Sequence, residues 1–227
     1  MEPWERNRKD SSGAGEGRSF AYYKLPRGRH RLPRELIHQN QRWRLLGAAA
    51  EVVAERGYAD ATARAVATRA GVSSSTFYGN FDNLGQCLLA AYEMAAECLC
   101  DIVSDACEGG GEWPERLRAA LAGALEFLAA EPALAALLGA AAPAGDDAIV
   151  AARDRLLNRL AWPLRGGRGL LREAGAPPLA PDTEHRLAAA ALGLVSERVA
   201  AGETAGLPAL ADELAAVLAA PYKPVDC

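Results

Sequence analysis

Apolar residues along this chain recur with the period of an α-helix. The first such run places four of them at i, i+4, i+7 and i+8, on one face of a helix: Leu45, Ala49, Val52 and Val53. Order is expected to begin after Pro33. Gly57 suits the end of this helix because glycine tolerates the left-handed C-cap conformation. The pattern therefore predicts one amphipathic helix between these two residues.

Two short helices are predicted next, separated by a three-residue turn that begins with Gly71. Thr62 is a favourable N-cap for the first helix, which runs to about Ala70. Ser73 is a favourable N-cap for the second, which is expected to cover Ser74–Asn80. This spacing is typical of a helix-turn-helix, a motif whose second helix often enters the major groove of DNA.

The remainder of the chain also follows a helical pattern. A long fourth helix is predicted from about Leu84 to Cys107, and the glycines at 109–111 end it. Further helices are expected at about 112–130, 131–140, 146–175, 182–202 and 206–220. Pro163 must kink or break the long segment 146–175, because proline lacks an amide donor. Nothing in the sequence alternates as a strand does, so the predicted fold class is all-α.

The helix at 182–202 is expected to bury an apolar stripe flanked by alanines. The members of the stripe are Leu187, Ala191, Leu194, Val195 and Val199. Small neighbouring side chains let another helix approach closely, and that helix can come from the same chain or from a second subunit.

Composition agrees with a helical protein that has no membrane span. Half of the residues are hydrophobic but only 6% are aromatic. The longest uncharged run, 132–145, has 14 residues and contains Pro143, whereas a spanning helix needs roughly 20 apolar residues. Glu2, Glu5 and Asp10 do not suit a signal peptide, so we expect a cytoplasmic location.

Charge is distributed unevenly along the chain. Residues 1–90 carry 14 Lys or Arg against 9 Asp or Glu, and residues 91–227 carry 11 against 20. Residues 1–32 mix glycine, serine, proline and charge without apolar periodicity, which indicates a flexible basic arm. The basic stretch Lys24–Arg44 suits a polyanion such as nucleic acid, although a solvated tail would have the same composition.

The cysteines do not have the spacing of a zinc site. They are Cys87, Cys98, Cys100, Cys107 and Cys227. Their odd number and spacing favour reduced thiols, and the sequence predicts no metal and no cofactor. The four between positions 87 and 107 are either a redox sensor or small core residues of a helix, and the sequence leaves both readings open.

Residues 57–81 combine the turn spacing with particular residue types. The chain reads Gly57-Tyr58, Thr62, Val66-Ala67, Ala70-Gly71-Val72-Ser73 and Thr76-Phe77-Tyr78-Gly79-Asn80-Phe81. From about Leu45 to Leu88 the sequence closely resembles the DNA-binding region of the TetR family of bacterial transcriptional regulators. The rest of the chain is similar to that family only in length and helical layout.

The resemblance implies three parts. Residues 1–32 would be the flexible basic arm, and residues 33–88 a three-helix DNA-binding helix-turn-helix domain with its motif at about 62–81. Residues 89–227 would be a helical bundle that binds an effector and dimerises.

Some motif residues have structural reasons that do not depend on the family. Ala67 and Ala70 are small enough for two helices to cross closely, and Gly71 permits a positive φ at the turn. Val72 and Phe77 fill the space beneath the turn.

Short polar groups on the third helix are the candidate DNA contacts. The resemblance implies sugar-phosphate contacts for Thr62, Thr76, Tyr78 and Asn80. It implies base contacts for Ser74 and Ser75, while Ser73 is a candidate contact that is also an N-cap. Tyr78 can equally pack against its neighbours.

The arm adds three candidate contacts, Arg27, Arg29 and Arg31, which would reach the neighbouring minor groove or phosphates. The chain departs from the family at Asn80, where histidine or tyrosine is usual, and at Leu84-Gly85, where a phosphate-binding lysine and an acid are usual. Each lost phosphate contact flattens the salt dependence of binding by about one unit. We therefore expect weaker intrinsic affinity, offset by the basic arm.

The function implied by the resemblance is that of a ligand-responsive regulator. It would bind a palindromic operator in double-stranded DNA as a homodimer formed by the helices at about 182–202 and 206–220. A small, apolar effector would release it, as expected of a repressor. Large side chains available to line an effector cavity are Tyr92, Met94, Trp113, Phe127, Leu156 and Trp162, and none is assigned as a ligand residue.

The sequence also bears on two other functions, an enzyme and a helical interaction protein. An enzyme is not expected, because His30, His38 and His185 have no matching nucleophile or metal spacing, and no catalytic residue is predicted. A helical interaction protein with weakened or lost operator binding is compatible with the residues at Ser74, Ser75 and Leu84. Retention on heparin or genomic DNA at low salt separates that alternative from a DNA-binding regulator.

Overall fold

The computed structural model describes residues 34–140 and 146–223, so the arm residues Arg27, Arg29 and Arg31 lie outside the described residues. Every element within these ranges is helical, as the sequence predicts. The elements are α2 (Arg34–Arg56), α3 (Ala63–Ala70), α4 (Ser74–Tyr78), α5 (Leu84–Cys107), α6 (Trp113–Ala130), α7 (Pro132–Ala140), α8 (Asp147–Ala161), η2 (Pro163–Gly167), α9 (Arg168–Glu173), α10 (Thr183–Ala200), η3 (Thr204–Leu210), α11 (Ala211–Ala219) and η4 (Ala220–Tyr222).

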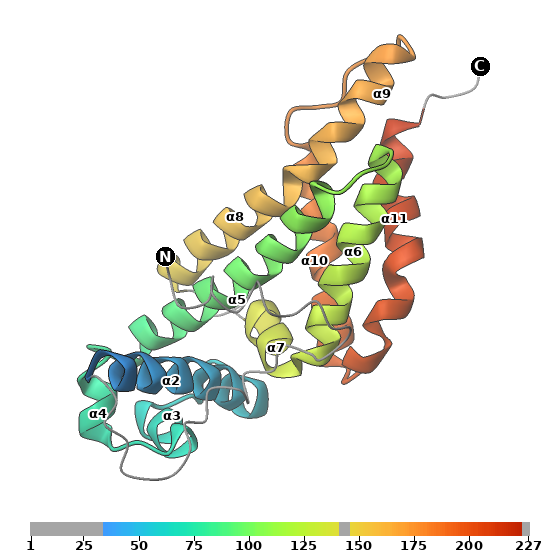
Figure 1. Ribbon diagram of the computed structural model, residues 1–227. Helices are drawn as coiled ribbons and strands as arrows, with labels where there is room; N and C mark the ends of the chain where they lie inside the picture. The colour runs from blue at the N-terminus through green and yellow to red at the C-terminus, as the bar shows by residue number, and fades with distance from the viewer. Residues whose placement is uncertain (1–33, 141–145, 224–227) are drawn as a thin grey trace.

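Helices α2, α3 and α4 form a small unit at one end of the molecule, and α5 leads from it into the bundle (Figure 1). Gly57, after α2, has a φ of +77°, as expected for the residue that ends the helix. The third helix is shorter than predicted and ends at Tyr78. The Asn80 amide bonds to the Phe77 carbonyl at 2.9 Å, which tightens the chain before it can complete another α-helical turn.

Proline divides the second half of the bundle. The predicted segment 146–175 is broken at Pro163, where the 3₁₀ turn η2 separates α8 from α9. The predicted helix at 206–220 contains Pro208, and its first part, η3, is also 3₁₀. Proline cannot donate the amide hydrogen bond of a helix interior, so the chain becomes α-helical only at Ala211.

The apolar stripe predicted for α10 is only partly buried against its own chain, and Leu187, Ala191 and Val199 are half-buried. Of its five residues only Val195 is buried, and the buried face is completed by Glu184, Ala188 and Leu192. Leu194 is 36% exposed. The helix is rotated in this way because Glu184 points inward, where it has buried partners.

A single hydrophobic cluster runs through the three-helix unit and the bundle. It extends from Leu45 in α2 to Leu214 in α11. Helix α2 packs against α3 on one side and against α5 and α7 on the other. A second, smaller cluster around Trp113 and Tyr222 fills the end of the bundle that is distant from α2.

No single helix among the described residues is long and apolar enough to cross a membrane. Helices α6 and α7 meet the length and composition required only as a pair, and that pair is bent by 103°.

Glu184 is the one charged residue that is fully buried in the described part of the chain, and it is bonded from two directions. Arg168 donates from Nε to Oε1 at 2.6 Å and from Nη2 to Oε2 at 2.8 Å. The Tyr222 hydroxyl donates to Oε1 at 3.2 Å. The Arg168 hydrogen bonds hold the pKa of the Glu184 carboxyl below its ordinary value. This triad ties α9, α10 and the end of the chain together.

Replacing Glu184 with alanine should therefore destabilise the bundle. We expect Glu184→Ala to lower the free energy of unfolding by about 2 to 3 kcal/mol, because Arg168 and Tyr222 lose a buried partner. Since the folded-state pKa is lowered, the wild-type contribution is present above the unfolded pKa and disappears as pH falls through the folded value. Urea unfolding at neutral and acidic pH measures both effects. Glu173→Ala, at an exposed position of α9, is the control, and equal losses in the two variants would contradict the role of the triad.

Candidate nucleic-acid interface and effector cavity

The turn between α3 and α4 is built on Gly71. Its φ of +65° is left-handed, and the amide of Val72 bonds to the Ala67 carbonyl at 3.0 Å to close the turn. Phe77 is fully buried beneath it and packs on Phe81, with ring centroids 5.9 Å apart. These contacts fix the angle between the two short helices.

Two arginines of α2 brace this turn from the side. The Arg44 guanidinium donates to the carbonyls of Ala70 and Gly71. The Arg42 guanidinium lies 4.5 Å from the centre of the Phe81 ring and donates to the Asn80 carbonyl. Both belong to the basic stretch that the sequence assigned to a polyanion, but in the structure their guanidinium groups hold the motif together.

The two predicted N-caps are present. The Thr62 hydroxyl accepts a hydrogen bond from the Ala65 amide at 3.2 Å, and the Ser73 hydroxyl accepts one from the Thr76 amide at 3.0 Å. Each satisfies an amide that a helix start leaves without a partner. Thr62 and Ser73 remain exposed, so capping does not remove them from the surface.

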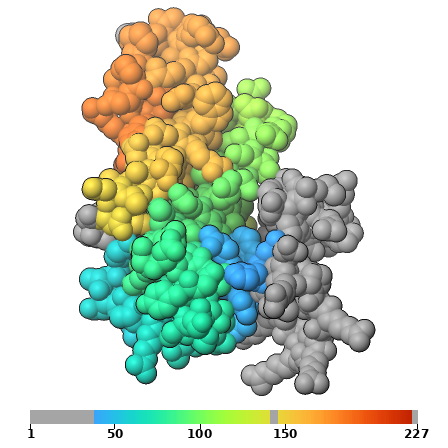
Figure 2. Space-filling model, turned by 90° about the vertical axis from the view of Figure 1, so that its left-hand side faces the viewer, coloured from blue at the N-terminus to red at the C-terminus, as the bar shows by residue number. Residues whose placement is uncertain are grey.

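The predicted base contacts and one predicted phosphate contact lie on the outer face of α4. Ser74 and Ser75 are exposed, and the Tyr78 side chain is 59% exposed although its ring touches Phe77 edge-on. Figure 2 shows this segment, coloured teal, at the surface of the three-helix end. The structure thus gathers three of the candidate residues on one exposed helix.

Two other candidates are turned back on the helix. The Asn80 side-chain amide donates to the Thr76 carbonyl at 2.8 Å. The Thr76 hydroxyl shares a 2.9 Å hydrogen bond with that of Ser73. Part of their hydrogen-bonding capacity is already used within the motif, which the spacing of the residues does not indicate.

Charged residues of α3 differ in how free they are. Arg69 is paired with Glu51 and Glu55 of α2, and this pairing lowers the pKa of Glu55. Arg64 is exposed, two residues after Thr62, and forms no ion pair with another described residue. Its place beside a predicted phosphate contact makes it a candidate that the motif comparison missed. Its helical position on the outer side of α3 was the available signal.

The three-helix unit is also bonded to the bundle through Tyr58. Its hydroxyl donates to Asp146 Oδ2 at 3.0 Å, and Asp146 is the N-cap of α8. Burial and this bond raise the pKa of Tyr58 to about 12. The loop after α2 and the start of α8 are therefore held together.

An apolar cavity of about 90 Å³ lies within the bundle. Its walls are leucine, valine, alanine and proline side chains from α5, α6, α8, α10, α11 and η2, including Leu99, Leu121 and Leu192. A larger cavity of about 370 Å³ adjoins it, and the two share Leu117 and Pro163. Of the aromatic residues proposed for an effector cavity, Trp113 and Trp162 line the larger one.

Two cysteines of α5, Cys87 and Cys100, are buried in the core, and Cys98 and Cys107 are half-buried. Burial raises the pKa of Cys87 to about 12 and that of Cys100 to about 11, and it also raises the pKa of Cys107. Such thiols are protonated at neutral pH and react poorly with oxidants. No group of three or more candidate metal ligands occurs among the described residues.

Residues 45–91 match the family described as bacterial regulatory proteins, tetR family. Over 83% of its length the chain also has the fold of a TetR-like transcriptional regulator from Rhodococcus sp. RHA1, with 25% identity, 96% of that chain covered and a TM-score of 0.59. Residues 45–91 are thus similar in sequence to the DNA-binding region of TetR-family regulators, and the fold of the chain is of the TetR type. Its helix-turn-helix consists of α3 and α4, and the first helix of the TetR-type domain is α2.

Two further proteins are similar to this chain. The HTH-type transcriptional activator FasR of Mycolicibacterium smegmatis is 33% identical over 105 residues, which are 46% of this chain and 48% of FasR. The chain thus matches about half the length of that curated relative. The transcriptional regulator FadR of Bacillus subtilis, solved in complex with stearoyl-CoA, has 19% identity, covers 78% of this chain and 96% of its own, and has a TM-score of 0.66. At that identity FadR supports the fold alone.

The turn should tolerate alanine less well at Gly71 than at Gly57. Both glycines have a positive φ, which costs an alanine about 1 to 2 kcal/mol. A Cβ at Gly57 would meet nothing within 4 Å, whereas one at Gly71 would lie 2.8 Å from the Arg44 guanidinium and displace it from its carbonyl partners. We expect Gly57→Ala to lower the free energy of unfolding by about 1 kcal/mol and Gly71→Ala by about 2 kcal/mol or more in urea titrations. Identical losses would mean that Arg44 does not brace the turn.

Proposed function

We propose that this chain is a ligand-responsive transcription regulator that binds a palindromic operator as a homodimer and is released from it by an apolar effector. One observation carries the proposal. Helix α2 braces the turn that carries α4. It packs directly on α5 and α7, and α5 lines the apolar cavity. The surface that we propose binds DNA and the apolar cavity thus share one hydrophobic core.

On DNA, α4 would enter the major groove. Ser74 and Ser75 carry short hydroxyls that can donate to or accept from base edges. Thr62 and Tyr78 would contact phosphates, and Arg64 would add a charged contact beside Thr62. Ser73, Thr76 and Asn80 would contribute the hydrogen-bonding capacity that remains after their bonds within the motif.

The second subunit would pack on α10 and α11. Leu194 of α10 and Val217 of α11 are exposed apolar residues, at 36% and 57%. Gly193 lies in the interior of α10, and a Cβ added to it would meet no other atom within 4 Å. A glycine in a helix interior costs about 1 kcal/mol of stability relative to alanine. A small residue at an open position beside exposed apolar side chains suits the close approach of a second helix.

The effector would act by widening the bundle. A cavity of about 90 Å³ corresponds to roughly three water molecules, so a longer apolar ligand must move the surrounding helices apart. Because α5 lines the cavity and begins directly after the helix-turn-helix, that movement would change the spacing of the two recognition helices. A ligand that prefers the widened form weakens DNA binding by its difference in affinity for the two forms. Stearoyl-CoA, the ligand in the FadR complex, has an apolar chain of the kind such a cavity would take.

Removing the arm arginines should weaken DNA binding without changing sequence preference. We expect an Arg27→Gln, Arg29→Gln, Arg31→Gln variant to lose affinity for native and shuffled DNA alike, and to flatten the salt slope by about one unit per lost phosphate contact. Fluorescence anisotropy with DNA from immediately upstream of its own gene, at several salt concentrations, measures this.

The matched variant Ser74→Ala, Ser75→Ala should do the reverse, reducing the preference for native over shuffled DNA with an unchanged salt slope. Normal binding by the arm variant would remove the arm from the interface. No binding of wild-type protein to either DNA would favour the helical interaction protein instead.

The dimer interface is tested by placing charges on it. Leu194→Glu combined with Val217→Glu should convert the dimer to a monomer in sedimentation equilibrium, because two carboxylates per subunit would be buried without partners. Val150→Glu is the control, since Val150 is 49% exposed on α8, outside the proposed interface. A dimer that survives the double substitution, or is lost in the control, would place the interface elsewhere.

A further inference from the structure

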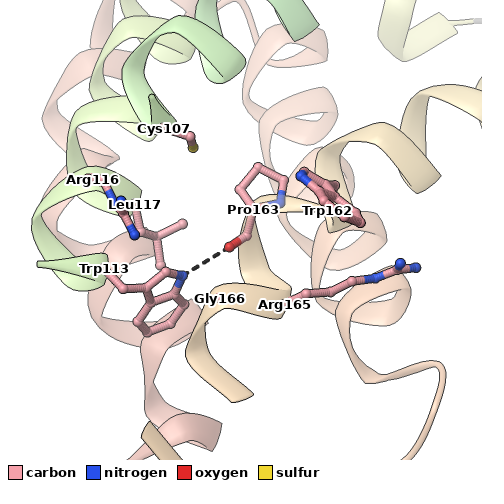
Figure 3. Close-up of a pocket in the computed structure, with 8 residues that line it drawn as sticks. All are labelled: Cys107, Trp113, Arg116, Leu117, Trp162, Pro163, Arg165 and Gly166. Atoms are coloured by element: carbon pink, nitrogen blue, oxygen red, sulfur yellow. Dashed lines mark hydrogen bonds between the residues drawn. The ribbon is translucent and has the colours of Figure 1, made fainter. Parts of the chain in front are cut away.

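The open cavity at the distal end of the bundle has two arginines in its lining. Arg116 of α6 and Arg165 of η2 belong to it, together with Trp113, Trp162 and Cys107; the Arg165 side chain extends outward beneath Trp162 (Figure 3). We call these five residues with Gly166 the mouth. Neither guanidinium forms an ion pair or a side-chain hydrogen bond with another described residue. The Arg165 guanidinium lies 5.5 Å from the centre of the Trp162 ring, whose side chain is 69% exposed.

Acidic residues near Arg116 have other partners. Glu112 and Glu115 form a capping box at the start of α6, in which each carboxylate accepts a hydrogen bond from a backbone amide of the first turn. The Glu115 carboxylate accepts from the Glu112 amide at 3.3 Å. Arg116 instead acts on the Cys107 thiol, whose pKa its charge lowers against the larger effect of burial. Arg116 and Cys107 both line the cavity.

The wall of the mouth is rigid. Trp113 donates from Nε1 to the Pro163 carbonyl at 2.9 Å and stacks edge-on against Tyr222. Gly166 and Gly167 make this possible, because a Cβ at Gly166 would lie 2.5 Å from the Trp113 ring and one at Gly167 2.6 Å from the Tyr222 ring. Two consecutive glycines that admit two aromatic rings indicate a shaped surface rather than an accidental gap.

The mouth adjoins the apolar cavity, since Leu117 and Pro163 line both. A ligand that occupied the two would be charged at one end and apolar at the other. Guanidinium groups bind carboxylates and phosphates, and an indole with a guanidinium over it offers a stacking surface. We propose that the mouth binds the anionic head group of an acyl-chain effector, with Arg116 and Arg165 contacting the head and Leu117 marking where the chain enters the bundle.

This inference rests on the proposed effector site and makes it specific. It names an anionic amphiphile, whose head can be a carboxylate or the phosphates of an acyl thioester of coenzyme A. The structure also assigns the direction of binding, with the head at the end distant from α4 and the chain pointing toward the three-helix unit.

Calorimetric titration of the full chain with three probes of equal chain length tests the head group. The probes are dodecanoate, dodecanoyl-CoA and 1-dodecanol. At least one anionic probe should bind tenfold or more tightly than the neutral alcohol, and that binding should weaken with added salt. Tighter binding of dodecanoyl-CoA than of dodecanoate identifies phosphates as the head, and the reverse order identifies a carboxylate. Equal binding of the alcohol would overturn the proposal.

Substitutions at the mouth separate charge from structure. The double substitution Arg116→Gln, Arg165→Gln should weaken binding of the anionic probe at least tenfold. It should change the affinity for 1-dodecanol less than twofold. Lysine at both positions should restore part of the affinity. Arg172→Gln is the control, because Arg172 is exposed on α9 outside the lining. Unchanged binding of the anionic probe in the glutamine variant would overturn the proposal.

The same preparations titrated with DNA distinguish the two hypotheses. DNA binding without binding of any probe overturns the head-group site and leaves operator binding intact. Probe binding that depends on Arg116 and Arg165, without DNA binding, overturns the proposed function and supports the mouth.

Discussion

The packing of α2 on both halves of the molecule is the constraint on which the rest depends. Its apolar residues from Leu45 to Val53 are buried against α3 on one side and against α5 and α7 on the other. From the same helix, Arg42 and Arg44 reach across to the turn that carries α4. The three-helix unit therefore has no separate core, and α2, which braces the turn before α4, is itself packed on the bundle. A close-packed interior of this kind transmits a displacement rather than absorbing it.

Helix α5 and the Tyr58–Asp146 bond provide two routes for such a displacement. α5 begins beside the helix-turn-helix with its Asn83 cap, and two turns further into the bundle it contributes the fully buried Tyr92, whose hydroxyl has no hydrogen-bond partner among the described groups. It then lines the apolar cavity with Leu99. The Tyr58 hydroxyl fixes the loop after α2 to the first turn of α8. A ligand that displaced α5 or α8 would pull on both connections. Each connection ends in the three-helix unit, which carries Ser74 and Ser75.

The features that could be predicted from the sequence are those that depend on residues close together in the chain. The caps at Thr62 and Ser73, the positive φ of Gly71 and the break at Pro163 depend on residues within one turn of each other, and all four are present. The errors and omissions depend on contacts between distant positions. Glu184 points inward because Arg168 and Tyr222 meet it there, and the Arg42–Asn80 contact spans 38 positions. A period of apolar residues cannot show a carboxylate on the buried face, so the burial of Glu184 on α10 could not be predicted.

The uneven charge of the chain gives each end of the molecule a different partner. Residues 91–227 carry nine more acidic than basic side chains, 20 against 11, so the bundle as a whole repels polyanions. Under the proposed function, DNA would therefore bind at the N-terminal end, where the basic residues are concentrated. Against that acidic background, the unpaired guanidiniums of Arg116 and Arg165 form a local exception beside an apolar cavity. A small anion can be held there by direct contact, because screening limits the repulsion from the acidic surface to about 8 to 10 Å in physiological salt. A phosphate backbone would have to lie across the whole acidic surface, and it would be repelled.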